Sequence, residues 1–579
     1  MDLAHPSSDT GGGSGRDSPF AFFALILLCL FVLFYHLGDP ALFEPDEGRS
    51  AEIAREILLL NDWATPHYNF TPRLDKPIFF YATIALSYRL FGISEAAARA
   101  PSALAGLGCV LLTYLLGRTF LGHWGALWGG LILLTSMEYL ALSHAAVPDM
   151  TLVFFITLAL GAFCWAGRAG TGMKRRACYL TMYAGIGCAT LVKGPVGVFI
   201  PGIVIISYLL WTKRWSIVRE MEPLFGALVF LALVGPWYAW TEWRNPGYLR
   251  YFLLEENLLR FLTQRFHRGE PWYYFLGVLA AGFLPWTLLL PFVVADWRKR
   301  AIDDFCRFLF LWTALPFLFF SLSSAKLSQY ILPIFSPLAL LSGGALARLL
   351  RDPPRSGGRI LFLPLLALVA PLFYFLLGVC WPVILPRPLR DWIADLAQAD
   401  RAFAAKVAVA AAVAAGLAAW VLFQKERRRL YLSSCLVFLL FAYLGQKILV
   451  PVSWNRSSKE LAQRSLPLIR PQDRIVIYDT YLSSLPFYLR IQTPIWVVWS
   501  GRKNTIMGSL YVAEKNPPPA PGYGQVLFTF EEFSERWKDS DRRLVVFVKD
   551  KNLPYLSGVV GAAPKTLLDG SGVVVVTNR

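Results

Sequence analysis

The residues of this sequence that could do chemistry are charged or polar side chains at the ends of long apolar segments. The stretch FEPDEGRS (43–50) opens with three acids, and similar residues recur along the first 330 positions. They are Glu44, Asp46, Glu47, Arg49, Asp75, Lys76, Asp149, Lys193, His267, Arg268, Lys326 and Tyr330. Polar groups beside a bilayer are costly and usually mark a functional site.

Carboxylates and cations on one face of a membrane suit group transfer from a phosphorylated lipid. A carboxylate such as Asp46 or Asp149 can abstract a proton from an acceptor or orient it. Cations can stabilise the phosphate leaving group as its bond to the sugar breaks. The cations that we expect to bind the donor phosphate are Lys76, Arg49, Lys193 and Arg268.

Each of these residues also has a purely structural interpretation. Asp46, Asp75 and Asp149 lie where helices are expected to begin, and a carboxylate there could cap the helix or complement its dipole. Lys76 could extend its ammonium from the interface to water. A lone histidine such as His267 is more often a surface residue than a ligand.

The composition indicates that membrane-spanning segments position these residues. The chain is 56% hydrophobic and only 16% charged, whereas soluble globular chains carry about 25% charged residues. The run FAFFALILLCLFVLFYHL (21–38) is long enough to cross a hydrocarbon core of roughly 30 Å. The sequence therefore predicts a polytopic α-helical membrane protein.

The apolar runs predict thirteen transmembrane spans. They lie near residues 20–37, 97–117, 124–143, 149–167, 178–193, 196–212, 222–240, 273–295, 304–323, 330–349, 359–381, 403–423 and 430–450. A further run, 77–92, is short for a span and contains Arg89, so we expect an interfacial or re-entrant helix there. The segment SAEIAREILLL (50–60) reads as an amphipathic helix.

Charge sets the predicted orientation. The net charge of +17 comes largely from basic residues in short loops on one side of the spans. This is the positive-inside pattern, and it excludes nucleic acid as the reason for the charge. We therefore expect a cytoplasmic N-terminus, with the loop 38–96 and everything after 450 facing the outer side of the membrane.

Three regions are predicted. Residues 1–19 form a polar, Gly/Ser-rich cytoplasmic tail that we expect to be disordered. Residues 20–450 form the transmembrane domain, including the outer loop 38–96. Residues 451–579 form a small α/β domain, because β-branched runs alternate there with polar, helix-compatible stretches. The runs are RIVIYD (474–479), PIWVVW (494–499), QVLFTF (525–530), RLVVFVK (543–549) and GVVVVTN (572–578).

The chemistry-bearing motifs resemble those of the dolichyl-phosphate-mannose/protein mannosyltransferase-like superfamily of bacteria. Within it the sequence is most similar to the aminoarabinose transferases that decorate lipid A. The resemblance is strong over roughly residues 20–340, and beyond them only the layout agrees. The motifs are PDEGRSAEIAREILLLNDW (45–63), RLDKPIFFY (73–81), ISEAAARAPSALAGL (93–107), VPDMTLVFF (147–155) and LVKGPVG (191–197).

The resemblance implies a GT-C fold, in which juxtamembrane helices follow the first span, and a sugar carried on undecaprenyl phosphate as the donor. It also implies a bacterial inner membrane, so that the outer side of the spans and residues 451–579 would face the periplasm. The essential acid of the first outer loop maps onto Asp46, and the second acid maps onto Asp149. The lysine of the L-[DE]-K-P motif maps onto Lys76, where it would hold the donor phosphate. Arg49 matches a basic position just after the first acid.

Further positions follow from the same resemblance. Lys326 and Tyr330 fall where a later loop closes over the donor, and we group Glu47 with them as a substrate-binding residue. The resemblance also allows a divalent metal between Asp75 and His267, although we expect no cofactor to be required.

The sequence thus predicts an inverting membrane glycosyltransferase with Asp46 as base or orienter. Its partners would be a polyprenyl-phosphate sugar donor, a lipid A or related glycan acceptor, and the bilayer. One alternative is a protein O-mannosyltransferase. Another is a transporter or flippase of lipid-linked sugars, which is disfavoured because no internal repeat is found and the polar residues cluster at one end of the spans.

Overall fold

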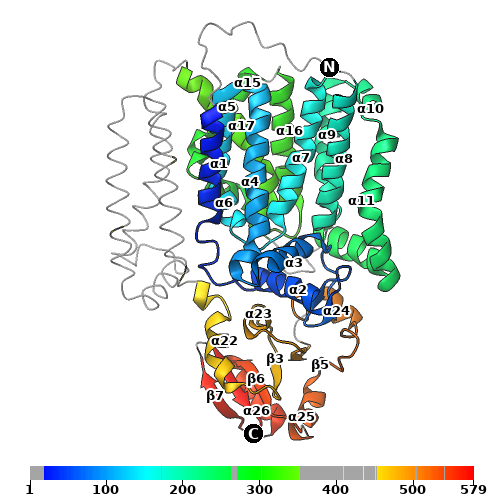
Figure 1. Cartoon of the computed structure of the whole chain (residues 1–579), viewed down its shortest axis with the longest axis vertical. Helices are drawn as coiled ribbons and strands as arrows, with labels where there is room; N and C mark the ends of the chain where they lie inside the picture. Colours follow the sequence, from blue (N-terminus) through cyan, green and yellow to red (C-terminus); the bar gives the residue numbers. More distant parts are fainter. Residues whose placement is uncertain are drawn as a thin grey trace. The chain divides into compact units, whose positions relative to one another are not determined.

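The computed structural model describes two compact units of the chain (Figure 1). The first unit comprises Met1–Leu37, Arg99–Ala239 and Leu253–Leu449, and the second comprises Gly38–Ala98, Trp240–Phe252 and Val450–Arg579. The described residues are 19–170, 172–262, 270–300, 303–351, 409, 435, 450, 453–501, 505–539, 541–561, 563–570 and 572–579.

The first unit is a bundle of apolar helices, which run side by side in Figure 1. Three of its helices, α4, α11 and η1, begin or end in the second unit. The elements are α1 (Pro19–Phe34), α4 (Glu95–Phe120), α5 (Gly122–Leu134), α6 (Met137–Ser143), α7 (Asp149–Arg168), α8 (Met173–Lys193), α9 (Val196–Thr212), α10 (Ser216–Glu220), α11 (Pro223–Arg244), the π-helix η1 (Tyr251–Leu259), α13 (Arg260–Leu262), α14 (Tyr274–Gly282), η2 (Trp286–Leu289), α15 (Leu290–Lys299), α16 (Asp304–Leu322), η3 (Ser328–Ile334) and α17 (Phe335–Arg351).

Within the described residues, five helices are long and apolar enough to cross a membrane, and up to seven if each of two bent pairs is one span. The bent pairs are α5 with α6, at 65°, and α14 with the η2–α15 segment, at 106°. The predicted polytopic helical membrane protein is confirmed, whereas the number of thirteen spans stays a prediction. The last three predicted spans lie outside the described residues, apart from single positions.

Close helix contacts in the bundle depend on small residues. Helix α7 packs against α8, and α5 packs against α17. A Cβ at Gly343 of α17 would lie 2.4 Å from the backbone nitrogen of Gly129 in α5. Any larger residue at position 343 would push these two helices apart, as expected where small residues allow membrane helices to approach closely.

The second unit begins with two helices separated by a short hairpin. These elements are α2 (Asp46–Leu60), the antiparallel strands β1 (His67–Tyr68) and β2 (Thr71–Pro72), and α3 (Phe79–Phe91). Helix α3 has 13 residues, which corresponds to about 20 Å and is shorter than the roughly 30 Å hydrocarbon core. Its length is consistent with the prediction that 77–92 does not cross the membrane.

The helix predicted at 50–60 is present as part of α2, but it does not have the exposed face of an amphipathic helix, because α2 is buried on nearly every side. Glu52 and Glu56 are both 0% exposed. Glu52 forms a bidentate ion pair with Arg55, whose Nη2 lies 2.7 Å from Glu52 Oε1. Glu56 accepts the backbone N–H groups of Asn69 and Phe70 at 2.7 and 2.9 Å. Arg55 of the same helix and two backbone N–H groups of the hairpin thus reduce the free-energy cost of burying these two carboxylates.

The rest of the second unit is an α/β fold around a six-stranded sheet. The strand order is β5-β4-β3-β6-β8-β7, with β5, β4, β3 and β6 parallel and β8 antiparallel to both β6 and β7. The elements are α12 (Tyr248–Arg250), α22 (Lys459–Ser465), η6 (Leu466–Leu468), β3 (Arg474–Tyr478), α23 (Leu485–Leu489), β4 (Trp496–Val498), α24 (Leu510–Lys515), β5 (Leu527–Phe528), α25 (Phe530–Asp539), β6 (Leu544–Lys549), η7 (Asp550–Asn552), α26 (Leu553–Val560), β7 (Lys565–Asp569) and β8 (Val573–Thr577).

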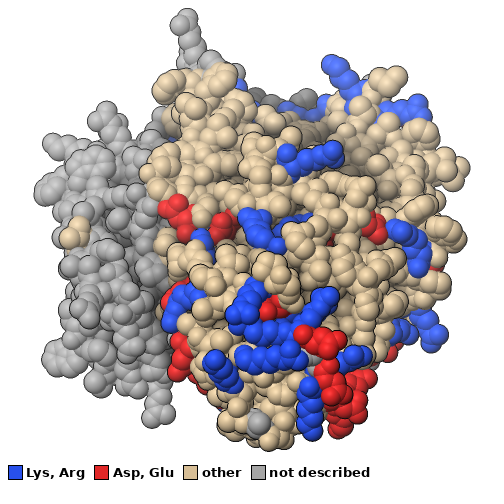
Figure 2. Space-filling model, turned by 60° about the horizontal axis from the view of Figure 1, so that its bottom comes forward, with Lys and Arg blue, Asp and Glu red and all other residues tan. Residues whose placement is uncertain are grey.

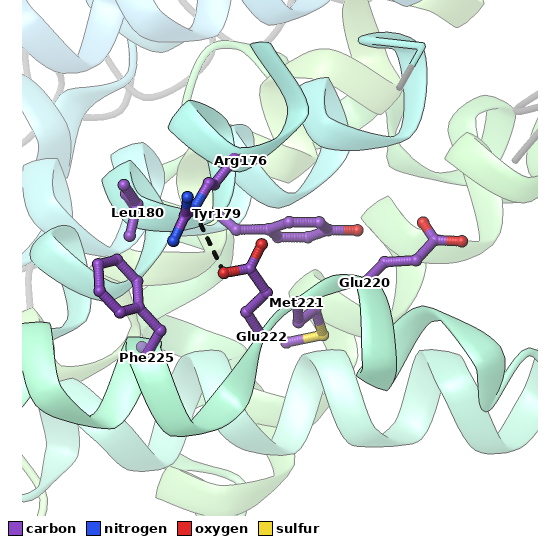
Figure 3. A pocket seen from close by; sticks show the side chains of 8 residues that line it. Arg176, Tyr179, Leu180, Glu220, Met221, Glu222 and Phe225 are labelled. Atoms are coloured by element: carbon purple, nitrogen blue, oxygen red, sulfur yellow. Dashed lines mark ion pairs between the residues drawn. The ribbon is translucent and has the colours of Figure 1, made fainter. Parts of the chain in front are cut away.

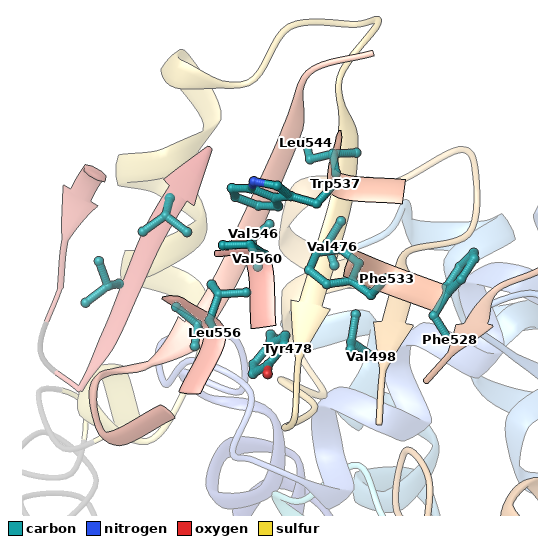
Figure 4. Packing of buried hydrophobic residues seen from close by; sticks show 13 residues of the cluster. Val476, Tyr478, Val498, Phe528, Phe533, Trp537, Leu544, Val546, Leu556 and Val560 are labelled. Carbon is teal, nitrogen blue, oxygen red and sulfur yellow. The ribbon is translucent and has the colours of Figure 1, made fainter. Parts of the chain in front are cut away.

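Strand periodicity builds a core on each face of this sheet. On one face Val546 and the other even-numbered residues of β6 pack with Phe533 and Trp537 of α25 and with Leu556 of α26 (Figure 4). On the other face Val545 and Phe547 of β6 pack with residues of α22 and α23 and with Phe70 of the hairpin. The five strands expected from sequence are all present.

The sequence did not predict one strand of the sheet, nor that the loop 38–98 groups with the C-terminal segment. Strand β7 (Lys565–Asp569) has the sequence KTLLD, which lacks the β-branched run by which the other strands were found. The loop 38–98 forms one unit with the C-terminal segment, whereas the sequence prediction placed it in the transmembrane domain. The three-domain division itself stays a prediction.

Lysine and arginine side chains gather in patches on the face in Figure 2, with smaller acidic groups beside them.

Candidate active site

Asp46 is the first residue of α2 and pairs with Arg49 one turn later. Arg49 Nη1 donates to Asp46 Oδ1 at 3.2 Å. The Asp46 side chain is 47% exposed, and that of Arg49 is 17% exposed. The N-cap position is Pro45, and no side chain caps the helix. The capping interpretation of Asp46 is therefore not what this structure adopts, and its carboxylate remains accessible to a ligand.

Arg49 retains hydrogen-bonding capacity after this pair is made. Its Nε is buried and has no hydrogen-bond partner among the described residues. A buried donor without an acceptor costs free energy that an anion at this position would recover. The guanidinium lies against Gly508, where a Cβ would come within 2.8 Å of Arg49 Nη2.

Asp75 is a buried junction of the second unit and is 8% exposed. Its Oδ2 lies 2.8 Å from Arg73 Nη2. Its Oδ1 accepts hydrogen bonds from Ser509 Oγ at 2.7 Å and from the Tyr251 hydroxyl at 3.2 Å. It does not cap α3, which has Ile78 at its N-cap position. Asp75 therefore ties together three segments that are far apart in the sequence.

Arg73 completes this junction and was missed by the sequence reasoning. It is 4% exposed and donates to the carbonyl oxygens of Met507 and Gly508 at 2.9 and 3.0 Å. Its position two residues before Asp75 was the only local signal of the pair. Together, Arg73 and Asp75 fix the backbone that carries Lys76, which is half-buried.

The described residues around Asp75 do not fit a metal site. Both carboxylate oxygens are engaged by a guanidinium and two hydroxyl groups, none of which is a metal ligand of choice. Over the described part of the chain no group of three or more His, Cys, Asp or Glu side chains is arranged to hold a metal. His267, the predicted second ligand, lies outside the described residues, as does Arg268.

The other two acids of the opening stretch support the local fold. The Glu44 carboxylate accepts hydrogen bonds from the backbone nitrogens of Ser483 and Ser484, at 2.6 and 2.7 Å, and from the Ser458 hydroxyl, at 2.8 Å. Glu47 is 4% exposed and accepts the backbone N–H of Phe43 at 3.0 Å. Contact of Glu47 with a substrate stays a prediction.

In the first unit, Asp149 and Lys193 form a buried ion pair. Lys193 Nζ lies 2.5 Å from Asp149 Oδ1, and Asp149 is 4% exposed. Asp149 begins α7 and Lys193 ends α8, so the contact between these two helices brings the residues together. Asp149 makes no side-chain cap of α7, which has Pro148 at its N-cap position. The Asp149 carboxylate thus binds the Lys193 ammonium and does not cap α7.

Tyr330 extends this pair into a network. The Lys193 ammonium lies 4.8 Å from the centre of the Tyr330 ring, a cation–π distance. Arg260 donates to the Tyr330 hydroxyl at 3.3 Å and forms an ion pair with Glu256. Neither Arg260 nor Glu256 was selected from the sequence, although their i, i+4 spacing was a visible signal.

Lys326 does not join this network through any described contact. It is 7% exposed, and its ammonium donates to the carbonyl oxygens of Ser323 and Glu270 at 2.7 and 3.0 Å. These bonds hold the residues just after α16 against the segment before α14. Lys326 thus shapes the loop around η3, and its contact with a donor stays a prediction.

A small pocket at the opposite ends of the first unit's helices is structural. Figure 3 shows Arg176 pointing toward Glu222, with Phe225 and Tyr179 beside them. The Arg176–Glu222 distance is 3.3 Å, and a neighbouring pair joins Arg175 to Glu220 at 2.7 Å. The cavity volume of about 10 Å³ corresponds to no more than one water, so no substrate fits there.

These observations define a class of protein: a polytopic helical membrane protein with a GT-C-type bundle, an α/β unit, and paired acids and cations at helix ends. A family model described as dolichyl-phosphate-mannose-protein mannosyltransferase matches residues 75–240. The crystal structure of ArnT from Cupriavidus metallidurans bound to undecaprenyl phosphate is similar, with a TM-score of 0.81 and 26% sequence identity. That similarity covers 97% of this chain and 98% of the other.

Curated relatives are named undecaprenyl phosphate-alpha-4-amino-4-deoxy-L-arabinose arabinosyl transferases. The protein of Pseudomonas paraeruginosa is 35% identical over 356 residues, covering 60% of this chain and 64% of the relative. That of Edwardsiella ictaluri is 33% identical over 327 residues, covering 56% and 59%. The chain thus spans about three fifths of the length of the curated relatives it matches. The resemblance to the mannosyltransferase-like GT-C superfamily, and within it to the aminoarabinose transferases, is confirmed.

Proposed function

We propose that this chain is a membrane glycosyltransferase that moves a sugar from a polyprenyl-phosphate donor to a cell-envelope acceptor, lipid A or a related glycan. The observation that carries the proposal is Arg49, whose buried Nε has no acceptor among the residues that the structure describes and lies beside the accessible carboxylate of Asp46. An anionic donor would supply that acceptor. The names of the relatives and the ligand of the Cupriavidus metallidurans structure support the same substrate class.

In the proposed reaction an acceptor oxygen attacks the anomeric carbon of the donor sugar from the side opposite the phosphate. The new C–O bond forms as the bond to the phosphate oxygen breaks, and the configuration inverts. Asp46 takes the proton of a hydroxyl acceptor, or orients an acceptor that is already an ionised phosphate. The polyprenyl phosphate leaves with the bonding electrons, and Arg49 and Lys76 stabilise its charge.

Arg73 and Asp75 act in this proposal as positioning residues. Their ion pair holds the backbone turn that carries Lys76, so that this turn need not be ordered when the donor binds. Such pre-organisation reduces the entropy that binding must offset. No step of the reaction is assigned to a metal.

We assign the network of the first unit to substrate binding. Asp149 organises the cations of this unit, and Lys193, whose side chain is covered by the Tyr330 ring, stays a predicted ligand of the donor phosphate. The proposal retains the predicted setting of a bacterial inner membrane, with the N-terminus cytoplasmic and residues 451–579 periplasmic. The partners are the lipid-linked donor, the acceptor and the bilayer.

Replacement of Asp46 by Asn tests the proposal, because it keeps the shape and removes the charge. We expect the Asp46→Asn protein to be present in membranes at normal levels and to lose sugar transfer from a radiolabelled polyprenyl-phosphate donor to lipid A. Asp539→Asn, at an exposed position of α25, is the matched control. Near-normal transfer by Asp46→Asn would remove this residue from its role.

A second candidate, a protein O-mannosyltransferase, is favoured only by the description of the family model that matches 75–240. The two candidates differ in acceptor. Mass spectrometry of the envelope lipids and of the membrane proteins, with and without the gene, separates them: a missing sugar on lipid A supports the first, and a missing hexose on proteins supports the second.

A further inference from the structure

The second unit contains a cavity that the proposed reaction does not use. Its volume is about 380 Å³, within the roughly 300–1,000 Å³ range of small-molecule sites. Its described lining includes neither Asp46, nor Arg49, nor Lys76. Binding of a ligand in this cavity can be measured without sugar transfer.

The cavity lies at the edge of the sheet where ligands bind in open α/β folds. Tyr481 and Leu482, which follow β3, line it, and so does Lys549 at the end of β6. Strands β3 and β6 are parallel neighbours, so their carboxyl ends share this edge. The chain adds β4 and β5 on one side of β3 and then crosses to place β6 on the other side. A crevice at such a reversal of strand order is the usual ligand site of open α/β sheets.

The chemistry of the lining favours a ligand that is anionic at one end. Arg456, Arg464 and Lys549 bring three cations to the cavity wall. Glu460 lies 3.6 Å from Arg464 and offsets part of that charge. Guanidinium and ammonium groups recognise phosphate through charge-assisted hydrogen bonds. The remaining excess of positive charge therefore suits a phosphate group.

The other end of the ligand would meet aromatic and apolar surface. Trp454 and Tyr481 line the cavity together with Leu461, Leu482 and Val573. The Trp454 ring is held in place on one side by the Lys459 ammonium, 5.3 Å from the ring centre. An amphipathic ring with a fixed orientation offers an apolar surface to the hydrophobic face of a sugar without ordering a flexible side chain.

The wall of the cavity is rigid because Glu44 binds its backbone. This carboxylate accepts four hydrogen bonds of 2.6–2.8 Å, from Ser458 Oγ, the backbone nitrogens of Ser483 and Ser484, and Ser484 Oγ. These neutral donors stabilise the carboxylate without removing its charge, so the described lining holds three cations, Arg456, Arg464 and Lys549, against the two carboxylates of Glu44 and Glu460. The cavity is thus fixed in shape and positive in character.

We propose that this cavity binds a phosphorylated saccharide, with the phosphate on Arg456, Arg464 and Lys549 and the sugar against Trp454. The same chemistry occurs in a soluble sugar phosphate and in the headgroup of a phosphorylated glycolipid. The two sources are distinguished by the probes used in the test.

The test measures binding to the full-length protein in detergent by isothermal titration calorimetry. The probes are glucosamine 1-phosphate, glucosamine and purified lipid A. We expect Arg456→Glu and Lys549→Glu each to weaken the binding of the phosphorylated probe at least tenfold. The matched control is Lys565→Ala, an exposed lysine of β7 at the opposite edge of the sheet, which should bind as the wild type does.

Each outcome decides the proposal. Binding of glucosamine 1-phosphate identifies a soluble ligand. Binding of lipid A alone identifies the lipid-borne form only if Arg456→Glu weakens it, because lipid A bound as the acceptor of the proposed reaction would not depend on this residue. If neither probe binds, if glucosamine binds as tightly as its phosphate, or if both charge reversals bind normally, the proposal is wrong. Because Arg456 is exposed, its replacement should leave the melting temperature unchanged. If Lys549→Glu fails to fold, Arg456→Glu alone decides whether the cavity binds the phosphorylated probe.

Discussion

Removing the Arg73 side chain should destabilise the second unit strongly. In Arg73→Ala the Asp75 carboxylate keeps only two hydroxyl donors in a site where it is 8% exposed. Breaking a buried ion pair by deleting one partner costs about 3–5 kcal/mol. The lost hydrogen bonds to the carbonyl oxygens of Met507 and Gly508 add to this cost.

The magnitude converts to a shift in melting temperature. For a unit of roughly 200 residues, 1 kcal/mol corresponds to about 2–4 °C, so Arg73→Ala should lower the melting temperature by about 6–20 °C. The assay is intrinsic tryptophan fluorescence of the purified protein in detergent. Arg536→Ala, which removes an exposed arginine of α25, is the control and should shift it by less than about 2 °C.

A double-mutant cycle identifies the cause. Arg73→Ala combined with Asp75→Asn should cost less than the sum of the single changes, because the uncompensated charge is no longer buried. Additive losses would show that the two side chains do not interact. A melting temperature of Arg73→Ala equal to that of Arg536→Ala would refute the assignment of this pair as a junction of the fold.

Three further outcomes are expected. Burial and the neighbouring Glu52 raise the pKa of Glu56 well above its usual value of 4.5. The stability that the protonated form contributes is therefore complete below pH 4.5 and is lost as the pH rises through the raised pKa. Because glutamine does not titrate, Glu56→Gln should reduce the fall of the melting temperature with pH. Lys193→Met should cost about 3–5 kcal/mol by leaving Asp149 buried and unpaired, and a normal melting temperature would contradict the pairing. Gly508→Ala, at φ +74° and 2.8 Å from the Arg49 guanidinium, should cost about 1–2 kcal/mol and raise the KM for the donor more than it lowers kcat; an unchanged KM would show that Arg49 does not contact the donor.

Several features of the candidate site depended on partners that no local pattern shows. Asp46, Asp75 and Asp149 all stand near helix starts, where capping was a sound interpretation, yet none caps its helix. Asp75 is bound by Ser509, which lies 434 positions away, and Asp149 by Lys193, 44 positions away. Tertiary packing brings a cation or a hydroxyl group to these carboxylates, and these partners bind them in place of a helix cap.

The sequence by itself determined the elements whose signal is local. Hydropathy identified the apolar helices, since a span needs about 20 apolar residues in a row. β-Branched runs identified five strands of the sheet. Strand β7 was not predicted, because KTLLD carries no such run. The burial of α2 was not predicted either, because its charges are neutralised by residues of the hairpin and by their own neighbours.

Only the tertiary structure decided which acid meets which cation and where a cavity is left. The junction of Arg73 and Asp75, the network around Lys193 and the crevice at the carboxyl ends of β3 and β6 all combine segments that are distant in the chain. The physical reason is that an unpaired buried charge costs free energy. At the junction and in the network, groups from another part of the chain reduce this cost.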